Sequence, residues 1–458
     1  MPFIRSISGL RATCGDALIP SIISDYIAAF SKLMPEGIIV VGRDGRPSGR
    51  WIEQLVLGTL AACGRETLTL GLVPTPTVQF AVEKLNAAGG IAITASHNPG
   101  QWNGLKFINN SGVLLDKTEN EALWNIVDTK QFIFQTDLKT IEFKTNYEII
   151  DTHINSILSL PIFIKANFLE SIKTRKYKIV VDAVNASGSY AIPALLKKFG
   201  CEVIQLYCDG SGIFPHTPEP LPENLTELAK AVKENHADLG IAVDPDADRL
   251  VLIDETGNQI GEEKTIVLAI YSLLTANLAF PLYNELNVIV NYSTTRLVED
   301  IAQQFGAKVF RSPVGEINVV KLMKANNGII GGEGSGGVIL ADCHYGRDSL
   351  VGTALILYLL SKSKNSISEI CNSLPKYHMI KKKYPYSGNL TSLIEDFRQE
   401  FKDGEAILDD GIKICFDKSW IQLRGSNTEP MIRLISEAPS EEEAEKLICR
   451  AFKMIEKR

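Results

Sequence analysis

Four short polar stretches of the chain carry residue types that can do chemistry, and the first sets a serine next to a histidine. It reads Thr-Ala-Ser-His-Asn-Pro over residues 94–99 and follows the apolar run 91–93, which is typical of a short buried strand. An Asn-Pro turn or a helix cap would explain these letters without any chemistry. Alternatively, Ser96 is a nucleophile or a phosphate carrier at the carboxyl end of the strand, with the imidazole of His97 beside it.

The second stretch, Asp-Pro-Asp-Ala-Asp-Arg, lies between two apolar runs. The carboxylates of Asp244, Asp246 and Asp248 alternate along it, so they can converge on one hard cation such as Mg²⁺. An EF-hand is excluded because its loop needs glycine where this chain has Arg249, and because the flanking runs resemble strands. An acidic surface turn is the alternative. We favour a metal site, since three acids beside an apolar strand would repel each other without a counter-ion.

The third stretch, Gly-Gly-Glu-Gly-Ser-Gly-Gly over residues 331–337, matches the Gly-x-Gly-x-x-Gly pattern of dinucleotide sites only weakly. Residues 338–340 look like a strand where such a site needs a helix, and Gly352 stands where it needs an acid. The glycines could instead bring the backbone close to a ligand, with Glu333 and Ser335 bonding its hydroxyl groups. A flexible hairpin is the alternative.

The fourth stretch, Arg-Gly-Ser-Asn-Thr-Glu-Pro over residues 424–430, joins two strand-like runs. Its polar side chains and backbone N–H groups can form an anion cradle, in which Arg424 supplies a bidentate fork for a phosphate and Arg433 a second one. A plain turn is the alternative. Nearer the N-terminus, Gly-Arg-Asp-Gly-Arg-Pro-Ser-Gly over residues 42–49 predicts a salt-bridged loop or the rim of a site.

The stretches between these motifs alternate strand-like and helical patterns, and the alternation restarts near residues 178–182 and 286–290. Such alternation indicates layered units with helices on the faces of a sheet. Beyond Tyr377, strand-like runs precede one helical stretch at residues 441–456, which indicates a small α+β domain. We therefore expect four domains, at residues 1–150, 151–255, 256–376 and 377–458.

The composition is that of a globular protein with several domains. Of 458 residues, 45% are hydrophobic and 22% are charged. The formal net charge of −7 argues against a nucleic-acid partner, while local arginines can still bind an anionic substrate. We interpret the basic run 381–383 as solvated surface.

Signals for membranes and secretion are not evident. The longest apolar run, 265–280, is shorter than the roughly 20 residues of a membrane span, so we expect a buried helix and no membrane contact. Arg5 and Arg11 stand where a signal peptide would have its apolar core. The 8 cysteines contain no Cys-x-x-Cys pair, which indicates reduced thiols in a cytoplasmic protein.

Taken in order, these motifs resemble those of the α-D-phosphohexomutases along the whole chain. The resemblance implies three related mixed-sheet α/β domains around a central cleft, followed by a smaller C-terminal α+β domain. Two further stretches contribute to it, Ser-Gly-Leu-Arg at residues 8–11 and Asn-Gly-Leu-Lys-Phe at residues 103–107.

The resemblance also implies roles for individual residues. Ser96 is expected to be phosphorylated, and Asp244, Asp246 and Asp248 are expected to hold Mg²⁺ together with a phosphoserine oxygen. Glu333 matches the sugar-reading loop. The other expected site residues are Arg11, His97, Lys106 and Arg249 around the phosphoserine, Ser335 in the sugar loop, and Arg424, Ser426, Asn427, Thr428 and Arg433 at the phosphate.

The chain departs from the commonest family pattern at Gly337, where many members have a histidine. This leaves the general base open. His344 is a candidate, although we favour its interpretation as a loop histidine without a role. With this glycine and with the Gly-Arg-Asp triplet at residues 346–348, the chain resembles a subgroup whose members are phosphoglucosamine mutases or phosphomannomutase/phosphoglucomutases.

We therefore expect a mutase that moves phosphate between O6 and O1 of a hexose, with glucosamine phosphate as the leading substrate and glucose or mannose phosphate as the alternative. Expected cofactors are Mg²⁺, phosphoserine at Ser96 and a hexose 1,6-bisphosphate activator. We expect a monomer or homodimer that binds a phosphosugar. A serine-phosphate hydrolase and a non-catalytic sugar-phosphate binding protein are the alternatives from other classes.

Overall fold

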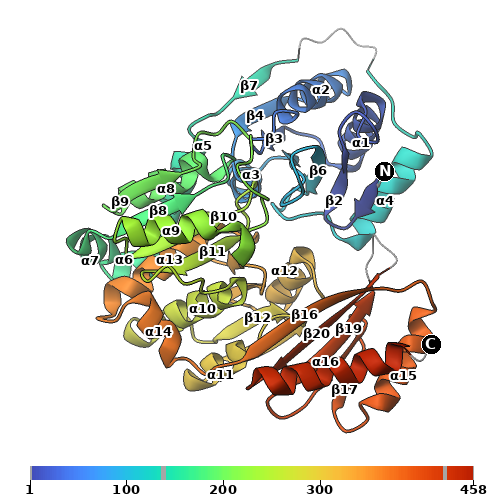
Figure 1. Ribbon diagram of the computed structural model, residues 1–458. Helices are drawn as coiled ribbons and strands as arrows, with labels where there is room; N and C mark the ends of the chain where they lie inside the picture. Colours follow the sequence, from blue (N-terminus) through green and yellow to red (C-terminus); the bar gives the residue numbers. More distant parts are fainter. Residues whose placement is uncertain (1–2, 136–140, 426–430, 457–458) are drawn as a thin grey trace.

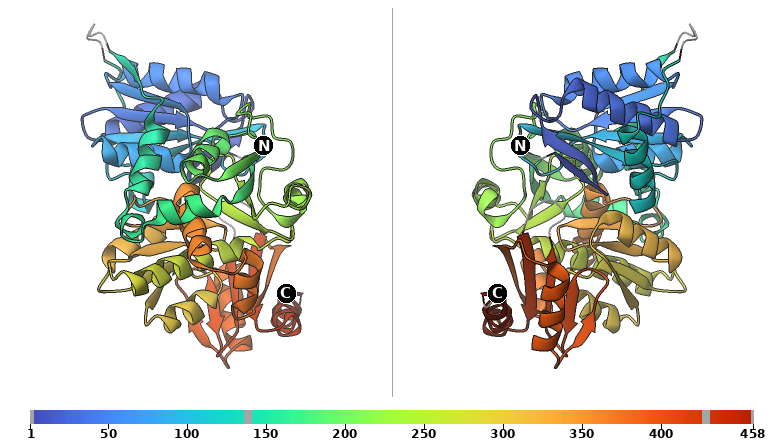
Figure 2. Two further views of the ribbon diagram at one scale, coloured as in Figure 1. Left: turned by 90° about the vertical axis from the view of Figure 1, so that its left-hand side faces the viewer. Right: turned by 90° about the vertical axis from the view of Figure 1, so that its right-hand side faces the viewer.

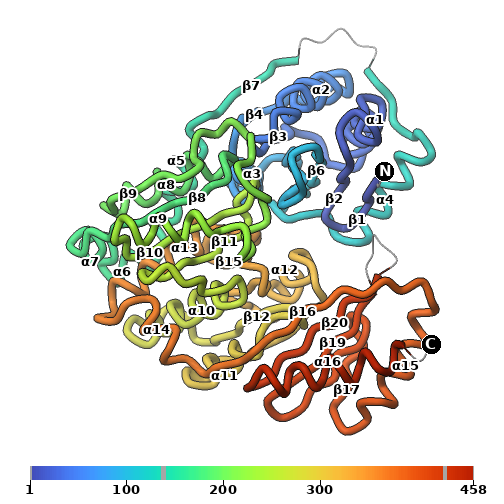
Figure 3. The backbone as a smooth tube through the Cα atoms, in the orientation of Figure 1, coloured from blue at the N-terminus to red at the C-terminus, as the bar shows by residue number. Residues whose placement is uncertain are grey.

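The computed structural model describes residues 3–135, 141–425 and 431–456, which form four domains with one β-sheet each (Figure 1). Figure 2 shows the N-terminal domain (blue) at the top and the third and fourth domains (yellow and red) beside each other at the bottom, with the second domain (green) between these two levels. The backbone trace in Figure 3 passes through them in chain order. The prediction of three α/β domains and a smaller α+β domain is confirmed. Within the described residues, no helix is both long and apolar enough to cross a membrane.

Domain I has its described strands in the order β1-β2-β6-β5-β3-β4-β7. The apolar strands β3 and β5 run parallel at the centre and are buried, because helices cover the sheet (Figure 1). Strand β6 returns antiparallel beside β5, so the sheet is mixed. The elements are β1 (Ile4–Ser6), β2 (Gly9–Thr13), α1 (Pro20–Leu33), β3 (Ile39–Arg43), α2 (Gly49–Ala62), β4 (Thr67–Leu72), α3 (Thr75–Lys84), β5 (Gly89–Ile93), β6 (Trp102–Ile108), α4 (Lys117–Asp128) and β7 (Phe143–Thr145).

Domain II has the strand order β11-β10-β8-β9. Strand β10 is buried along its whole length and pairs parallel with β8 and antiparallel with β11. The turn between β10 and β11 therefore lies at one edge of the sheet and carries the aspartate motif. The elements are α5 (Ile149–Leu158), α6 (Pro161–Lys165), α7 (Phe168–Arg175), β8 (Lys178–Asp182), α8 (Gly188–Lys198), β9 (Glu202–Leu206), η1 (Pro222–Asn224), α9 (Thr226–Glu234), β10 (Leu239–Val243) and β11 (Leu250–Asp254).

Domain III repeats this arrangement with the strand order β13-β12-β14-β15. The apolar run that we expected to be a buried helix lies in α10, whose inner residues are buried. Strands β14 and β15 form an antiparallel hairpin around the glycine-rich motif. The elements are α10 (Glu262–Ala279), β12 (Asn287–Asn291), α11 (Leu297–Gln304), β13 (Lys308–Ser312), α12 (Glu316–Ala325), β14 (Ile330–Glu333), β15 (Gly337–Leu340), α13 (Ser349–Lys362) and α14 (Ile367–Ser373).

Domain IV is an antiparallel sheet in the order β16-β20-β19-β18-β17, with helix α16 against β16 and β20. Helix α16 is amphipathic, with Ala444, Ile448 and Ala451 on its buried face. The domain matches the predicted run of strands followed by a helix. The elements are β16 (His378–Pro385), α15 (Leu390–Glu400), β17 (Glu405–Ile407), β18 (Ile412–Cys415), β19 (Trp420–Gly425), β20 (Met431–Ala438) and α16 (Glu441–Glu456).

Helix α13 joins domains II and III into one core, and the packing of α5 against α3 extends this core into domain I. The sequence of α13 is apolar on all sides, and nearly every residue from Ser349 to Ser361 is buried. It packs against α10 of domain III and against α7, α5 and α8. One apolar cluster consequently extends from Val40 to Leu374, whereas domain IV has a separate core around Phe397 and Leu423.

Polar contacts attach domain IV to domain III. The hydroxyl of Tyr292 donates to Asp409 at 2.7 Å, and the backbone N–H of Arg296 donates to Glu437 at 2.8 Å. At the same interface Lys413 is 3% exposed, and its Nζ donates to the carbonyl of Tyr292 at 2.6 Å. Burial lowers the pKa of Lys413 from 10.5 to about 7.

We expect Lys413 to make the free energy of unfolding rise with pH. Between about pH 7 and pH 10.5 the unfolded chain holds a proton on this amine that the folded protein has lost, so the folded state gains relative stability as pH rises. Below that window the amine is charged in both states and the gain is absent. Lys413→Met should be more stable than wild type near neutral pH and should lack this part of the rise.

Urea unfolding measured across the window tests this expectation, with the exposed Lys418→Met as the matched control. The control should follow the wild-type pH dependence. Parallel pH curves for Lys413→Met and wild type would contradict the assignment.

Candidate active site

A cavity of about 590 Å³ is lined by residues of all four domains. Its walls carry many cationic side chains, which suits an anionic ligand. These are Arg11, Lys106, Arg249, Arg347, Lys381, Lys383, Arg424 and Arg433. Of the expected site residues, the cavity wall also includes Ser96, His97, Glu333 and Ser335.

The loop that carries Ser96 leaves strand β5 with a strained backbone. Ser96 has φ +51°, in the left-handed region that serine rarely adopts. Its N–H donates to Oγ1 of Thr94 at 2.8 Å, and its carbonyl accepts from Nη2 of Arg46 at 2.6 Å. The side chain is buried, and Oγ lies 3.1 Å from Oδ2 of Asp244 and 3.3 Å from Nδ1 of His97. The fold therefore fixes this hydroxyl between a carboxylate and an imidazole.

Arg46 is the buried side chain that holds the serine loop in place. It is 0% exposed, it pairs with Asp44, and its Nη2 also donates to the carbonyl of Asn98 at 2.5 Å. Its guanidinium lies 5.0 Å from the centroid of the Phe214 ring. Of the two interpretations of residues 42–49, the structure favours the salt-bridged loop, in which Arg46 pairs with Asp44.

The three aspartates converge in the turn between β10 and β11. Oδ1 of Asp244 accepts the backbone N–H groups of Asp248 and Arg249, at 3.2 Å and 3.1 Å. All three carboxylates are buried. Burial and the nearby carboxylates of Asp246 and Asp248 raise the pKa of Asp244 well above its ordinary value. The turn thus places a cluster of acidic side chains next to the hydroxyl of Ser96.

Two cations offset part of this charge. Nζ of Lys106 lies 2.6 Å from Oδ2 of Asp246 and 2.7 Å from Oδ2 of Asp248, and Nη2 of Arg347 lies 2.7 Å from the same Asp248 oxygen. Burial acts against the charge of Lys106, but the two carboxylates outweigh burial and raise its pKa. Burial likewise acts to raise the pKa of Asp248, but Arg347 and Lys106 lower it.

The aspartate cluster fits a divalent cation. One oxygen each of Asp244, Asp246 and Asp248 lies within 4.8 Å of the others. Within the described part of the chain, the buried Oδ1 atoms of Asp246 and Asp248 have no hydrogen-bond partner. Buried anionic oxygens without donors are costly, and they are the ligands that Mg²⁺ prefers.

Basic residues surround the serine loop. Nη1 of Arg249 lies 3.6 Å from Oε1 of Glu219, and Arg11 donates to Oδ1 of Asn98 at 3.2 Å. The charge of Arg249, together with burial and the charge of Arg11, holds the pKa of His97 well below its usual value. These surroundings favour the neutral form of the His97 imidazole.

The glycine-rich hairpin presents Glu333 and Ser335 to the cavity. Glu333 is 6% exposed, and its Oε1 accepts from Nδ2 of Asn291 at 2.9 Å. Gly336 has φ +88°, and a side chain there would collide with the carbonyl of Leu250, so the turn requires glycine. The strand that follows excludes the strand–turn–helix geometry of a dinucleotide site.

Arg347 fills the space beside Gly337. A Cβ atom on this glycine would collide with the Arg347 side chain. Besides Asp248, Arg347 contacts Glu333 through Nη1 at 2.7 Å and Glu316 through Nε at 3.1 Å. We did not include Arg347 among the expected site residues, although the Gly-Arg-Asp triplet was the signal that could have identified it.

His344, the alternative candidate for the general base, is not among the described residues that line the cavity. It is 2% exposed, and its Nε2 lies 3.1 Å from Oδ2 of Asp348. It is therefore a buried and bonded side chain rather than an open loop residue, and it has no access to a ligand in the cleft.

Domain IV contributes a row of cations on neighbouring strands. Arg424 on β19 stands opposite Arg433 on β20, which in turn stands opposite Lys383 on β16. All three line the cavity, and Nη2 of Arg424 lies 3.3 Å from Oδ1 of Asp410. This row can receive an anionic group. The other expected members of the phosphate loop, Ser426, Asn427 and Thr428, lie outside the described residues.

Residues 381–383 are exposed, as the interpretation as solvated surface requires, but two of the three lysines also line the cavity. Alternate residues of a strand point to the same side, so Lys381 and Lys383 both face the cavity. Nζ of Lys381 lies 2.7 Å from both Glu262 and Glu263. A run of lysines in the sequence does not indicate whether the strand that carries them lies at a cavity or at open surface.

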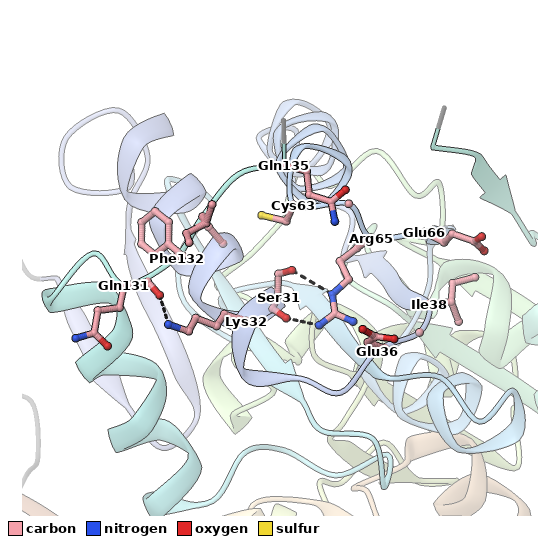
Figure 4. Close-up of a pocket in the computed structure, with 14 residues that line it drawn as sticks. Ser31, Lys32, Glu36, Ile38, Cys63, Arg65, Glu66, Gln131, Phe132 and Gln135 are labelled. Carbon is pink, nitrogen blue, oxygen red and sulfur yellow. Dashed lines mark hydrogen bonds between the residues drawn. The ribbon is translucent and has the colours of Figure 1, made fainter. Parts of the chain in front are cut away.

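A second cavity, of about 760 Å³, lies in domain I and contains none of the expected site residues. Figure 4 shows its cations turned toward the protein: Arg65 bonds to Ser31, and Lys32 bonds to the backbone of Gln131. Because the expected site residues line the cleft between the four domains and not this cavity, the cleft is the stronger candidate for the active site.

Comparisons with known proteins cover almost the whole chain. Four family profiles match in order: phosphoglucomutase/phosphomannomutase alpha/beta/alpha domains I, II and III at residues 4–134, 151–257 and 262–377, and the C-terminal domain at residues 388–453. A phosphoglucomutase/phosphomannomutase of Thermococcus kodakarensis is 36% identical over 456 residues, which covers 98% of this chain and 97% of the relative.

Two further relatives extend this similarity. A phosphoglucosamine/phosphogalactosamine mutase of Sulfurisphaera tokodaii is 30% identical over 458 residues, with 98% of each chain covered. The crystal structure of a phosphoglucomutase/phosphomannomutase family protein from Burkholderia thailandensis superposes with a TM-score of 0.83 at 25% identity, covering 99% of this chain and 98% of the other. The chain therefore belongs to the phosphoglucomutase/phosphomannomutase family, as its ordered motifs indicate.

Proposed function

We propose that the protein is a phosphohexomutase that interconverts a hexose 6-phosphate and a hexose 1-phosphate through a phosphoryl group carried on Ser96. Its leading substrate is glucosamine phosphate, and glucose or mannose phosphate is the alternative. The observation that carries the proposal is the position of the Ser96 hydroxyl, 3.1 Å from Asp244 and above a buried aspartate cluster, at the wall of a cationic cleft.

The chain's own charges suit phosphoryl transfer at Ser96. A phosphoserine carries about −1.5 to −2 charge at pH 7, and Arg11 and Arg249 lie around its loop to offset that charge. We assign Asp244, Asp246 and Asp248 as ligands of Mg²⁺, which when bound would neutralise charge on the transferring group. Lys106 holds two of these carboxylates in position.

The cleft has two ends for the two phosphates of a hexose bisphosphate. At one end Ser96 gives its phosphoryl group to a sugar hydroxyl. At the other end Arg424 and Arg433, with the loop residues Ser426, Asn427 and Thr428, hold the phosphate that does not react. The bisphosphate must then turn over, so that Ser96 takes back the other phosphate. Glu333 and Ser335 stand at the wall to bond the sugar hydroxyls in either orientation.

We assign to His97 the transfer of protons to and from the Ser96 hydroxyl when this oxygen loses or regains the phosphoryl group. His97 is the one histidine among the described residues that line the cavity, and the charges of Arg249 and Arg11 favour its neutral form by lowering its pKa. Its Nδ1 lies 3.3 Å from Oγ of Ser96, within reach of the oxygen that gains and loses the phosphoryl group. The proposal includes domain limits at residues 1–150, 151–255, 256–376 and 377–458, so that each domain brings one motif to the cleft.

The mutase is tested by ³¹P NMR of glucosamine 6-phosphate with Mg²⁺ and a trace of hexose 1,6-bisphosphate. We expect glucosamine 1-phosphate without free phosphate. Ser96→Ala should lower the rate at least about 10³-fold, because the phosphoryl carrier is lost, whereas the exposed Ser111→Ala should react normally.

Other results of the same experiment separate the alternatives. Conversion of glucose or mannose 1-phosphate, with none of glucosamine 6-phosphate, would keep the mechanism and change the substrate. Net release of inorganic phosphate would identify a hydrolase. A rate that survives Ser96→Ala would refute the role of this serine.

The metal assignment is tested by titrating Mn²⁺, as a reporter for Mg²⁺, into the protein with electron paramagnetic resonance of the free ion. Asp246→Asn removes one anionic ligand, so we expect at least about a tenfold weaker affinity, or 1.4 kcal/mol. The exposed Asp417→Asn should bind like wild type. Equal affinity of all three proteins would contradict the assignment.

Arg347 is expected to be essential for the fold of the cleft. Arg347→Met leaves the carboxylates of Asp248, Glu333 and Glu316 without their shared cation. We expect a loss of about 3–5 kcal/mol in the free energy of unfolding, measured with urea. Arg398→Met, which changes an exposed arginine, should cost far less, and a similar small cost at position 347 would show that these carboxylates do not depend on it.

A further inference from the structure

A second group of metal-ligating side chains lies buried outside the cleft. It consists of His153 on helix α5, Cys343 and His344 in the loop after β15, and Asp348 at the start of helix α13; we call it the His-Cys-Asp cluster. None of the four is among the described residues that line the cleft. Both histidines and the aspartate are at most 2% exposed.

The four ligand atoms of the cluster lie close to one another. Nε2 of His153 and Nε2 of His344 each lie 3.1 Å from Oδ2 of Asp348, and Sγ of Cys343 lies 3.9 Å from Nε2 of His153. All four atoms lie within 4.8 Å of one another. Around a tetrahedral zinc ion with bonds of about 2.0–2.3 Å, ligand atoms stand about 3.3–3.8 Å apart, so the spacing matches a small tetrahedral site.

The surroundings hold these side chains in position. The other oxygen of Asp348 accepts the backbone N–H of Leu350 at 2.8 Å, which caps α13 and aims Oδ2 at the histidines. Nδ1 of His153 lies 3.2 Å from Oγ1 of Thr77, and its ring stacks on Phe80 at 4.5 Å. Partners on the far ring nitrogen of this kind orient histidine ligands toward a metal.

Without an ion the two imidazoles of the cluster share one partner, because Nε2 of both His153 and His344 contacts the same oxygen of Asp348. The thiol of Cys343, which is half-buried, has a 3.9 Å contact with a ring nitrogen of His153. A divalent ion would be neutralised here by one thiolate and one carboxylate, with two neutral imidazoles completing the shell.

We propose that the His-Cys-Asp cluster is a structural zinc-type site, separate from the Mg²⁺ site of the cleft. The soft thiolate and the two imidazoles favour zinc over magnesium, and the tetrahedral spacing agrees with that preference. The ion would tie α5 to the segment that carries Arg347 into the cleft, and it would stabilise the folded protein because the unfolded chain lacks the assembled site.

The test uses the full-length protein, stripped with a chelator and then loaded with Co²⁺ as a spectroscopic substitute for zinc. We expect about one tightly held Co²⁺ per chain after desalting, with the strong visible bands of a tetrahedral ion and a near-ultraviolet thiolate-to-cobalt band. Cys343→Ser should lose the thiolate band. Cys371→Ser, which changes another partly buried cysteine outside the cluster, should keep it.

Co²⁺ bound at the aspartate cluster of the cleft has only oxygen ligands and gives no thiolate band, so the two sites are distinguished. A wild-type protein without the thiolate band, or a band that persists in Cys343→Ser, would overturn the proposal. If Cys343→Ser does not fold, as judged by circular dichroism, X-ray absorption of zinc-loaded wild type decides: one sulfur neighbour with three nitrogen or oxygen neighbours supports the site, and a shell without sulfur refutes it.

Discussion

Repulsion among three buried carboxylates is the constraint around which the cleft is built. Asp244, Asp246 and Asp248 share one turn, and each would be costly to bury alone. Lys106 and Arg347 can approach them only because β6 and the segment before α13 run alongside the same turn. The position of these elements, and not merely the acidic turn, therefore makes the cluster possible.

The same constraint reaches the serine loop and the sugar loop. Ser96 sits in a strained backbone conformation that the buried Arg46 maintains, and its hydroxyl ends beside Asp244. Arg347 passes beside Gly337 to reach both Asp248 and Glu333. The guanidinium of Arg347 thus connects the aspartate cluster to Glu333 in the hairpin. A change in the aspartate turn would therefore also disturb the hairpin.

The sequence indicates most of this architecture but not the contacts that complete it. Buried strands such as β10 have apolar runs that are plain in the sequence, and the motifs that follow β5, β10 and β14 come to a common cleft, because each lies at a strand end. Arg347 and Arg46 look like ordinary loop arginines, since burial depends on partners far away in the chain. Lys383 could not be identified from the sequence for the same reason, because its strand borders the cleft only once domain IV packs against the other domains.

The division of the apolar core has a consequence for how the molecule can come apart. Helix α13 joins domains II and III, and α5 packs against α3 of domain I, so one apolar cluster runs through the first three domains, beside a second core that belongs to domain I alone. Domain IV has its own core and is attached by polar bonds. Partial unfolding would therefore begin at domain IV. It would leave the serine loop and the three aspartates assembled, while Arg424 and Arg433 would be lost from the wall of the cavity, so the cleft would be open on the side of domain IV.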